Sequence, residues 1–186
     1  MRLSALFLVV AVLGAGCSKK PPEVAPTPTT EPQPTTPTTP TAPAQPAVDP
    51  AVCEAAITTA VGEVARMVTF DTDKYDVRAE DVAVLDAKAA LLQASPSVRL
   101  RLTGHADERY TDEYNLVLGT RRSEAVKDYL VRKGIEASRL ETASLGETDP
   151  LDQGHNEAAW SRNRRVEFAV IAGRETLAAR TPGCVR

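Results

Sequence analysis

Aromatic residues are scarce in this chain of 186 residues, which has one tryptophan, four tyrosines and three phenylalanines. Proteins that bind single-stranded nucleic acid stack the bases on several aromatic rings, and so small a set offers no such platform. The chain also lacks a surplus of basic residues, since 22 basic and 25 acidic side chains give a formal net charge of −3. Because nucleic-acid-binding domains are usually basic, we expect no nucleic-acid partner.

Histidine is scarce as well. His105 and His155 are the only two, and neither has other potential ligands at metal-binding spacing. Neither has a plausible cysteine partner for nucleophilic catalysis, and the chain contains no G-x-S-x-G sequence. Asp107 and Glu108 are adjacent, which does not by itself place two carboxylates across a scissile bond. We therefore expect no metal, no cofactor and no enzyme activity.

Only one long apolar run occurs, and it lies at the N-terminus. Leu3–Leu13 follows Arg2 and is too short to span a bilayer as a stable helix, a pattern typical of a secretory signal. Small residues then precede Cys17, and this arrangement is similar to a lipobox. We expect residues 1–16 to be a lipoprotein signal peptide and Cys17 to carry palmitate-type acyl chains. The alternative is an ordinary cleavage site beside a chance cysteine.

Residues 17–50 differ in composition from the rest. Eleven of the 14 prolines lie between Pro21 and Pro50, mixed with threonine and alanine. Such a segment cannot bury a core. Proline-rich chain extends by about 3.1 Å per residue, so the segment could reach on the order of 100 Å. We interpret it as a tether between a lipidated N-terminus and a domain at 51–186; a passive spacer of no particular length is the alternative.

Three cysteines are present, at Cys17, Cys53 and Cys184. If Cys17 carries lipid, the other two remain, and they flank the expected domain. An exported chain meets oxidising conditions, where such cysteines pair. We expect a Cys53–Cys184 disulfide that ties the first helix to the C-terminal tail, with two free thiols as the alternative.

Apolar periodicity divides the domain into alternating strands and helices. Strands are expected at Val64–Phe70, Val98–Thr103, Leu140–Leu145 and Arg164–Ile171, and helices at Ala51–Val61, Glu80–Ala94, Glu113–Lys133 and Asn156–Trp160. Gly134 should end the third helix. This order favours an α/β (α+β) sandwich, in which one mixed sheet of about four strands has helices packed on one face.

The run Gly104–Arg122, GHADERYTDEYNLVLGTRR, is the most informative motif. Asp107 precedes a helix on which Asn115 and Arg122 lie seven residues apart, about two turns, and therefore share a face. A carboxylate, an amide and a guanidinium converging there would suit a zwitterion, because the carboxylate binds an ammonium and the guanidinium binds a carboxylate. The alternative is purely structural: an acidic residue near the dipole of the helix N-terminus, with an internal Asp–Arg ion pair.

Four segments in this order resemble the OmpA-type C-terminal domain family, a peptidoglycan-binding module. They are MVTFDTDKYDV, TGHADER, EYNLVLGTRRSEAV and SRNRRVEF, and the resemblance runs from about Val64 to Ile171. Within the family, the chain is most similar to the peptidoglycan-associated lipoproteins of the Tol–Pal system. One departure is Tyr110, since many members have a glycine there and tyrosine resists a positive φ.

The resemblance implies roles for individual residues. Asp107 would hold the ammonium of meso-diaminopimelate, the cross-linking amino acid of the wall peptide, and Arg122 would hold its carboxylate. Asn115 matches an asparagine of the motif, which could instead bond the loop backbone.

Two further places border the implied pocket. Phe70 and Asp71 match its rim, although Phe70 suits the core equally well. Arg164 and Arg165 alternate on a strand, so that only one can face the site, and we favour Arg164. We also expect Asp107 and Arg122 to lie outside the core, so that their substitution leaves the fold intact.

These expectations combine into an outer-membrane lipoprotein, anchored by lipid and facing the periplasm. It would bind peptidoglycan non-covalently and tether the outer membrane to the wall, within the Tol–Pal system that serves envelope integrity and cell division. Periplasmic Tol-system proteins are the expected protein partners. The alternatives are the same module in another envelope machine, for secretion or motility, and a wall-remodelling enzyme.

Overall fold

A computed structural model describes residues 48–184 of the chain. The expected signal peptide, the expected lipidation site at Cys17 and most of the expected linker lie outside these residues. The described part begins just before α1, and the domain expected from residue 51 therefore corresponds to nearly all of it. No helix within it is both long and apolar enough to cross a bilayer.

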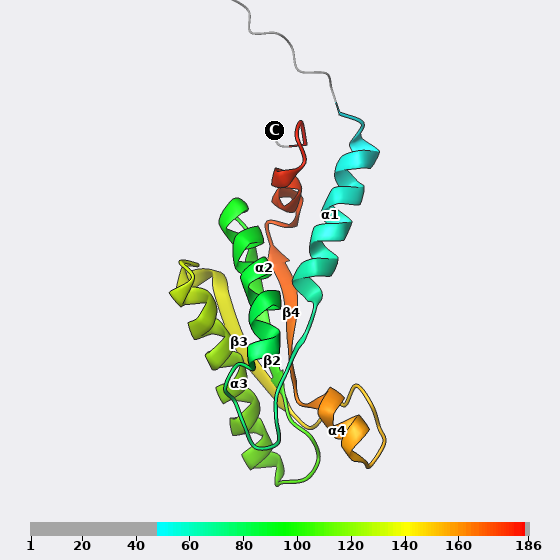
Figure 1. Ribbon diagram of the computed structural model, residues 1–186, viewed down its shortest axis with the longest axis vertical. Coiled ribbons are helices and arrows are strands. Elements are labelled where there is room, and N and C mark those ends of the chain that lie inside the picture. The colour runs from blue at the N-terminus through cyan, green and yellow to red at the C-terminus, as the bar shows by residue number, and fades with distance from the viewer. Residues whose placement is uncertain (1–47, 185–186) are drawn as a thin grey trace, which may run out of the picture. The chain divides into compact units, whose positions relative to one another are not determined.

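Four helices and four strands alternate along the domain (Figure 1). Their bounds are α1 Pro50–Ala65, β1 Val68–Thr69, α2 Val82–Ala94, β2 Arg99–His105, α3 Asp112–Arg132, β3 Leu140–Gly146, α4 Glu157–Asn163 and β4 Arg165–Ala172, with short 3₁₀ turns at Ala79–Asp81, Ala137–Arg139 and Arg174–Arg180. The strands form one sheet in the order β1-β4-β2-β3. β4 is antiparallel to β1 and β2, whereas β2 and β3 are parallel. The predicted mixed sheet of about four strands is confirmed.

Local sequence signals explain the helix ends. The side chains of Asp49, Thr111 and Asn156 each accept a hydrogen bond from a backbone N–H in the first turn of α1, α3 and α4, as N-caps do. Gly134 follows the last residues of α3 with φ +89°, a conformation that glycine adopts without strain. The prediction that α3 ends at Gly134 is confirmed.

The first predicted strand is mostly wrong. Only Val68 and Thr69 are extended, because α1 continues to Ala65 instead of ending at Val61. The longer helix places Ile57, Ala60 and Val64 at a spacing of three and four residues, and all three are buried. Val64, which the alternation of apolar residues assigned to a strand, is therefore apolar because it lies on the buried side of α1.

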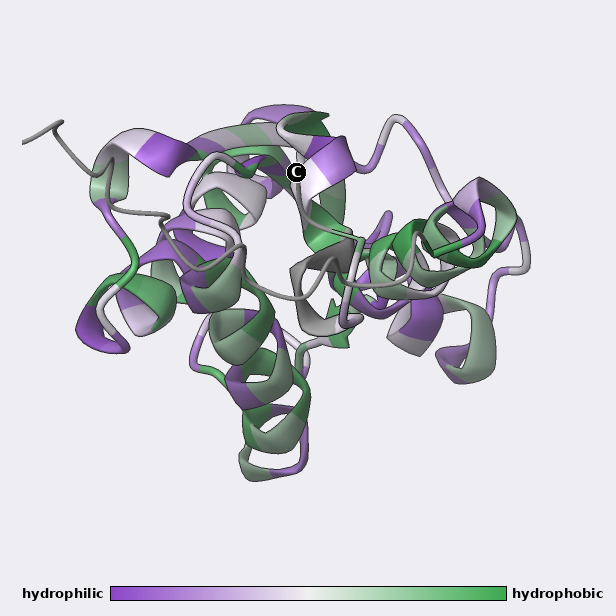
Figure 2. Cartoon of the chain, turned by 90° about the horizontal axis from the view of Figure 1, so that it is seen from above, coloured by the Kyte–Doolittle hydropathy of each residue, from purple (hydrophilic) through white to green (hydrophobic). Residues whose placement is uncertain are grey.

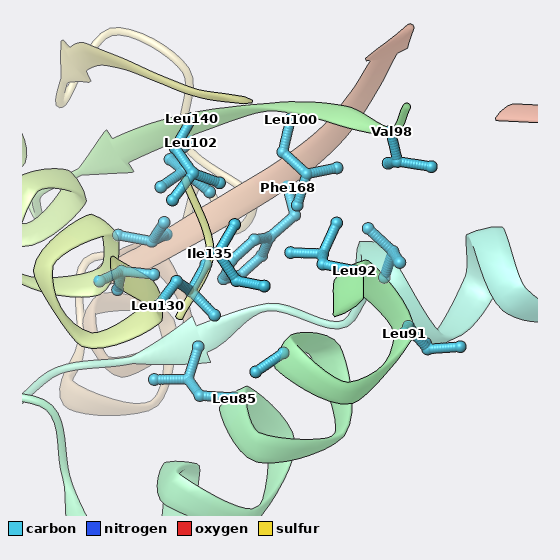
Figure 3. Packing of buried hydrophobic residues seen from close by; sticks show 14 of the residues in the cluster. Leu85, Leu91, Leu92, Val98, Leu100, Leu102, Leu130, Ile135, Leu140 and Phe168 are labelled. Carbon is cyan, nitrogen blue, oxygen red and sulfur yellow. The ribbon is translucent and has the colours of Figure 1, made fainter. Parts of the chain in front are cut away.

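One face of the sheet carries the hydrophobic core. Leu100, Leu102 and Phe168 point from β2 and β4 toward apolar side chains of α2 and α3 (Figure 3). The helices carry both hydrophilic and hydrophobic residues, as helices with one buried side do (Figure 2). On the opposite face, Arg99 and Arg101 are exposed and pair with Glu141. Helices therefore pack on one face, as predicted.

A glycine pair sets how closely α3 lies against β2. A Cβ atom at Gly104 would lie 1.8 Å from the carbonyl oxygen of Gly119, and one at Gly119 would lie 2.2 Å from the hydroxyl of Ser144. No side chain fits at either position without moving backbone. The close approach fixes the second half of α3, which carries Arg122, against the end of β2.

The two ends of the domain are joined by a disulfide. Cys53 of α1 is bonded to Cys184, with Cα atoms 5.3 Å apart, so the predicted pairing is confirmed. The N-terminal end of α1 and the C-terminal segment lie together at one end of the sheet (Figure 1).

Lys88 of α2 donates hydrogen bonds to carbonyls at the C-terminal end of α1. Its side chain is only 1% exposed, and its ammonium donates to the carbonyls of Glu63 at 3.1 Å and Val64 at 2.6 Å. It also lies 4.0 Å from the centre of the Phe168 ring. Burial lowers the pKa of Lys88 to about 7.

Candidate functional site

The ends of β1 and β2 and the start of β4 meet at one end of the sheet, away from the N-terminal end of α1 (Figure 1). Because β4 runs antiparallel to β1 and β2, its first residues lie beside the last residues of both strands. The backbone N–H of Phe70 accordingly donates to the carbonyl of Arg164 at 2.9 Å. Asp107 follows β2 directly, in the loop that leads to α3.

A charged junction is formed here by Asp107, Arg109 and Arg164, with Arg122 beneath them. Asp107 lies at its centre and is only 4% exposed. Its carboxylate accepts from the backbone N–H of Arg109 at 3.2 Å, from Nε and Nη2 of Arg109 at 3.0 and 2.8 Å, and from Nη1 of Arg164 at 3.2 Å. Burial alone raises the pKa of Asp107, but the hydrogen bonds from the two arginines outweigh it and hold the pKa below its usual value. Asp107 is therefore a carboxylate at neutral pH.

Arg164 is a fixed part of the junction. It is 5% exposed, and besides Asp107 it donates to the carbonyl of Phe70 at 2.9 Å and to Glu157 of α4 at 2.6 Å. Arg165 instead pairs with Glu167 and donates to the carbonyl of Asp149. Of the two arginines, the structure places Arg164 against Asp107, the arrangement that we favoured.

Arg122 lies beneath the junction and is fully buried. Its guanidinium donates to three backbone carbonyls, those of His105 at 2.7 Å, Lys74 at 2.9 Å and Asp71 at 3.2 Å. The expectation that Asp107 and Arg122 lie outside the core is wrong, because both are buried. The structural alternative of an internal Asp–Arg ion pair is present, but Asp107 forms it with Arg109 and Arg164 and not with Arg122. A single turn-forming loop, 70–78, supplies two of the carbonyls, which local spacing could not indicate.

The charge of Arg122 has no carboxylate partner within 4 Å in the described part of the chain. Burial lowers its pKa to about 10, although the charge of Asp107 opposes that shift. The guanidinium is thus a cation at neutral pH, compensated by carbonyl dipoles and by a carboxylate beyond direct contact.

The remaining predicted residues take different positions. Phe70 is 1% exposed and belongs to the core, with the Arg122 guanidinium 5.3 Å from its ring centre. Asp71 has an exposed side chain at the rim. Asn115 is fully buried, and its amide donates to Glu147 rather than to the loop around Asp107.

Tyr110 does not strain the loop. Among the described residues other than glycine, only Asp73 has a positive φ. The ring of Tyr110 is partly exposed and lies 4.9 Å from that of Tyr114. The glycine that many family members have here is therefore not required by this loop path.

Sequence reasoning missed Arg109 and its support. The Arg109 guanidinium lies 4.5 Å from the ring centre of Trp160 in α4, 3.1 Å from the hydroxyl of Thr72 and 3.6 Å from Glu157. The sequence places Arg109 two residues after Asp107, which could have indicated an interaction between them. Its contacts to Thr72 and α4 are remote in sequence and could not be predicted.

Glu108 links the same loop to α4. Its carboxylate accepts from Trp160 Nε1 at 2.9 Å and lies 2.6 Å from His155 Nδ1. Hydrogen bonds from these two side chains lower the pKa of Glu108. The loop after β2 and the segment around α4 are therefore held together by one network of charged and aromatic groups.

This arrangement can bind charged groups of both signs within one small region. Asp107 offers a nearly buried carboxylate, and three guanidiniums lie around or beneath it. Between residues 48 and 184, no three His, Cys, Asp or Glu side chains lie where they could hold a metal ion together.

Known protein families and structures include matches to the part of the chain that contains this junction. The OmpA family matches residues 69–164, a segment that contains Phe70, Asp71, Asp107, Asn115, Arg122 and Arg164. A peptidoglycan-associated lipoprotein of Haemophilus influenzae is 51% identical over 102 residues, which are 55% of this chain and 67% of that protein. One from Pasteurella multocida is 49% identical over 102 residues, covering 55% of this chain and 68% of that protein.

A solved structure supports the same relationship. The peptidoglycan-associated lipoprotein of Burkholderia pseudomallei has 40% sequence identity and a TM-score of 0.56, over 56% of this chain and 89% of that one. The match of the family over more than half of the chain, together with this shared fold, shows that the chain belongs to the OmpA family.

Proposed function

We propose that the domain binds peptidoglycan non-covalently by taking the side-chain end of meso-diaminopimelate at the Asp107 junction. The observation that carries the proposal is that a nearly buried carboxylate, Asp107, and a fully buried guanidinium, Arg122, lie in one region, while no carboxylate within the described residues contacts Arg122. The names of the relatives support the ligand class, since they are peptidoglycan-associated lipoproteins.

The geometry suits a zwitterion better than a single charge. A ligand ammonium can form charge-assisted hydrogen bonds with Asp107, and the surrounding arginines favour a carboxylate beside it. Arg122 contributes in a way that differs from a direct clamp. It fixes the carbonyls of the loop at 70–78 and adds positive potential from beneath the ligand.

The function is binding rather than catalysis. The ionisable groups of the junction are carboxylates and guanidiniums, and the pKa values of Asp107 and Arg122 leave both groups charged at neutral pH. Fixed charges suit recognition, whereas general acid–base catalysis uses groups whose pKa lies near the working pH.

The chain would tether the outer membrane to the wall. In this proposal acyl chains on Cys17 hold the N-terminus in the membrane, since two or more chains give stable anchorage. The proline-rich segment at 17–50 then spans part of the periplasm. Tol-system proteins are the proposed protein partners, in line with the resemblance of the motifs to those of the Tol–Pal lipoproteins.

Co-sedimentation with purified sacculi that contain meso-diaminopimelate tests the binding site. The wild-type protein should pellet with the sacculi, and Asp107→Asn should bind roughly 10- to 150-fold more weakly, since a hydrogen bond to a charged group contributes about 1.5–3 kcal/mol. Asp128→Asn, on the exposed side of α3, is the matched control and should bind like wild type. If Asp107→Asn binds the sacculi as tightly as wild type, the binding site lies elsewhere.

A further inference from the structure

Arg109 occupies the carboxylate that the proposed ligand needs. Three of the four hydrogen bonds to Asp107 come from Arg109, two from its guanidinium and one from its backbone N–H. A ligand ammonium can reach the Asp107 oxygens fully only by replacing the guanidinium.

The two arginines on Asp107 differ in their freedom to move. The side chain of Arg164 is 6% exposed and is fixed by a buried carbonyl as well as by Glu157. Arg109 has a side chain that is 29% exposed, and its other contacts are a hydroxyl, an exposed carboxylate and the face of Trp160. Of the two, Arg109 is the one that can turn away from Asp107 without leaving a buried carbonyl unpaired.

Charge decides what Arg109 would do next. The buried charged groups of the junction are Asp107, Arg164 and Arg122, one negative and two positive charges, which sum to +1. Glu157 is an exposed carboxylate beside them, 2.6 Å from Arg164 and 3.6 Å from Arg109. A ligand with an ammonium alone would add a further positive charge and leave the displaced Arg109 only Glu157, which Arg164 already pairs with. A zwitterion adds no net charge and brings a carboxylate that the displaced guanidinium can bind.

We infer that Arg109 is a specificity-determining residue that exchanges partners, giving up Asp107 to the ligand ammonium and binding the ligand carboxylate instead. Trp160 keeps the displaced guanidinium close by stacking. The inference rests on the proposed function and deepens it: Arg109 makes the site prefer diaminopimelate over lysine, which has the same ammonium but lacks the carboxylate.

Two wall tripeptides provide matched probes, L-Ala-D-Glu-meso-diaminopimelate and L-Ala-D-Glu-L-lysine. Affinities are measured by calorimetry on the full-length protein in mild detergent, for wild type, Arg109→Ala, Arg109→Lys and the control Arg101→Ala. Arg101 lies on the open face of the sheet and pairs there with Glu141. Circular dichroism on each variant establishes that it is folded.

Wild type should prefer the diaminopimelate peptide. Arg109→Ala should bind that peptide about ten- to a hundredfold more weakly, as expected when a charged hydrogen-bonding partner is lost. It should bind the lysine peptide as well as wild type or better, because Asp107 is no longer occupied. Arg109→Lys should fall between the two, and Arg101→Ala should match wild type.

Trp160 gives an independent readout, since it is the only tryptophan of the chain and Arg109 stacks on it. Saturating diaminopimelate peptide should change its fluorescence in wild type, and much less in Arg109→Ala. An equal change in both proteins would overturn the movement of Arg109.

The outcomes separate the inference from the proposed function. If Arg109→Ala keeps the wild-type preference for diaminopimelate, or weakens both peptides alike, the exchange is wrong while wall binding stands. If wild type binds neither peptide, the proposed function fails and the inference fails with it.

Discussion

Replacing Arg122 by lysine tests the finding that this side chain is part of the folded framework. The guanidinium donates from three nitrogen atoms to the carbonyls of His105, Lys74 and Asp71. A lysine ammonium donates from one atom and cannot span the three. The Asp71 carbonyl keeps a second donor, the backbone N–H of Lys74, so the loss falls mainly on the carbonyls of His105 and Lys74, which bond two different nitrogens of the guanidinium.

The expected loss of stability follows from these contacts. A hydrogen bond to a charged group contributes about 1.5–3 kcal/mol, and a buried carbonyl left unpaired costs about 1–3 kcal/mol. We therefore expect Arg122→Lys to lower the free energy of unfolding by about 2–4 kcal/mol, a large share of the roughly 5–15 kcal/mol of a typical domain.

Urea denaturation followed by circular dichroism, with the disulfide intact, measures this difference. Arg121→Lys is the matched control, because Arg121 is exposed and its guanidinium lies over the Tyr75 ring at 5.7 Å. The control should stay within about 0.5 kcal/mol of wild type. If Arg122→Lys also stays within that range, the three carbonyl bonds do not support the loop, and the reasoning is refuted.

Three further predictions concern the scaffold. Gly119→Ala should destabilise the domain by several kcal/mol, because its Cβ would lie 2.8 Å from the Gly104 carbonyl oxygen as well as against Ser144. Gly62→Ala should instead stabilise α1 by roughly 0.5–1 kcal/mol, because its Cβ meets nothing within 4 Å. Thermal melts of both variants measure these changes. Burial lowers the pKa of Lys88 from 10.5 to about 7. Between these pH values the unfolded chain binds more protons than the folded one, so the stability of wild type should rise with pH across this window. The urea midpoint, measured from pH 6.5 to 9.5, should rise in wild type and lose that rise in Lys88→Met. Replacing both Cys53 and Cys184 by serine should lower the unfolding free energy by roughly 3–5 kcal/mol, since the bond closes a loop with a sequence separation of 131; an unchanged urea midpoint would contradict it.

Elements with strong local signals were predictable from the sequence. α3 has an N-cap at Thr111 and a glycine after its C-terminus, and its predicted bounds differ from the observed ones by one residue at each end. β1 was not predictable in the same way, because Val64 fits a strand by alternation and a helix by its spacing from Ala60. The choice depends on the packing of α1 against the sheet, which is a tertiary effect.

The site illustrates the same distinction. Spacing correctly placed Asn115 and Arg122 on one face of α3, and both are buried there. Spacing could not indicate that loop carbonyls enclose Arg122, since two of them come from residues about 50 positions earlier. Arg109 was missed for a related reason. Its role depends on Trp160, which only the folded chain brings beside it.

The most direct test of the central claim is a crystal structure of the protein with L-Ala-D-Glu-meso-diaminopimelate bound. The account predicts the ammonium nitrogen of the diaminopimelate side chain within about 3 Å of an Asp107 carboxylate oxygen, the distance of a normal hydrogen bond. A peptide bound at another surface, such as the open face of the sheet around Arg101, with Asp107 making no contact to it, would contradict the account.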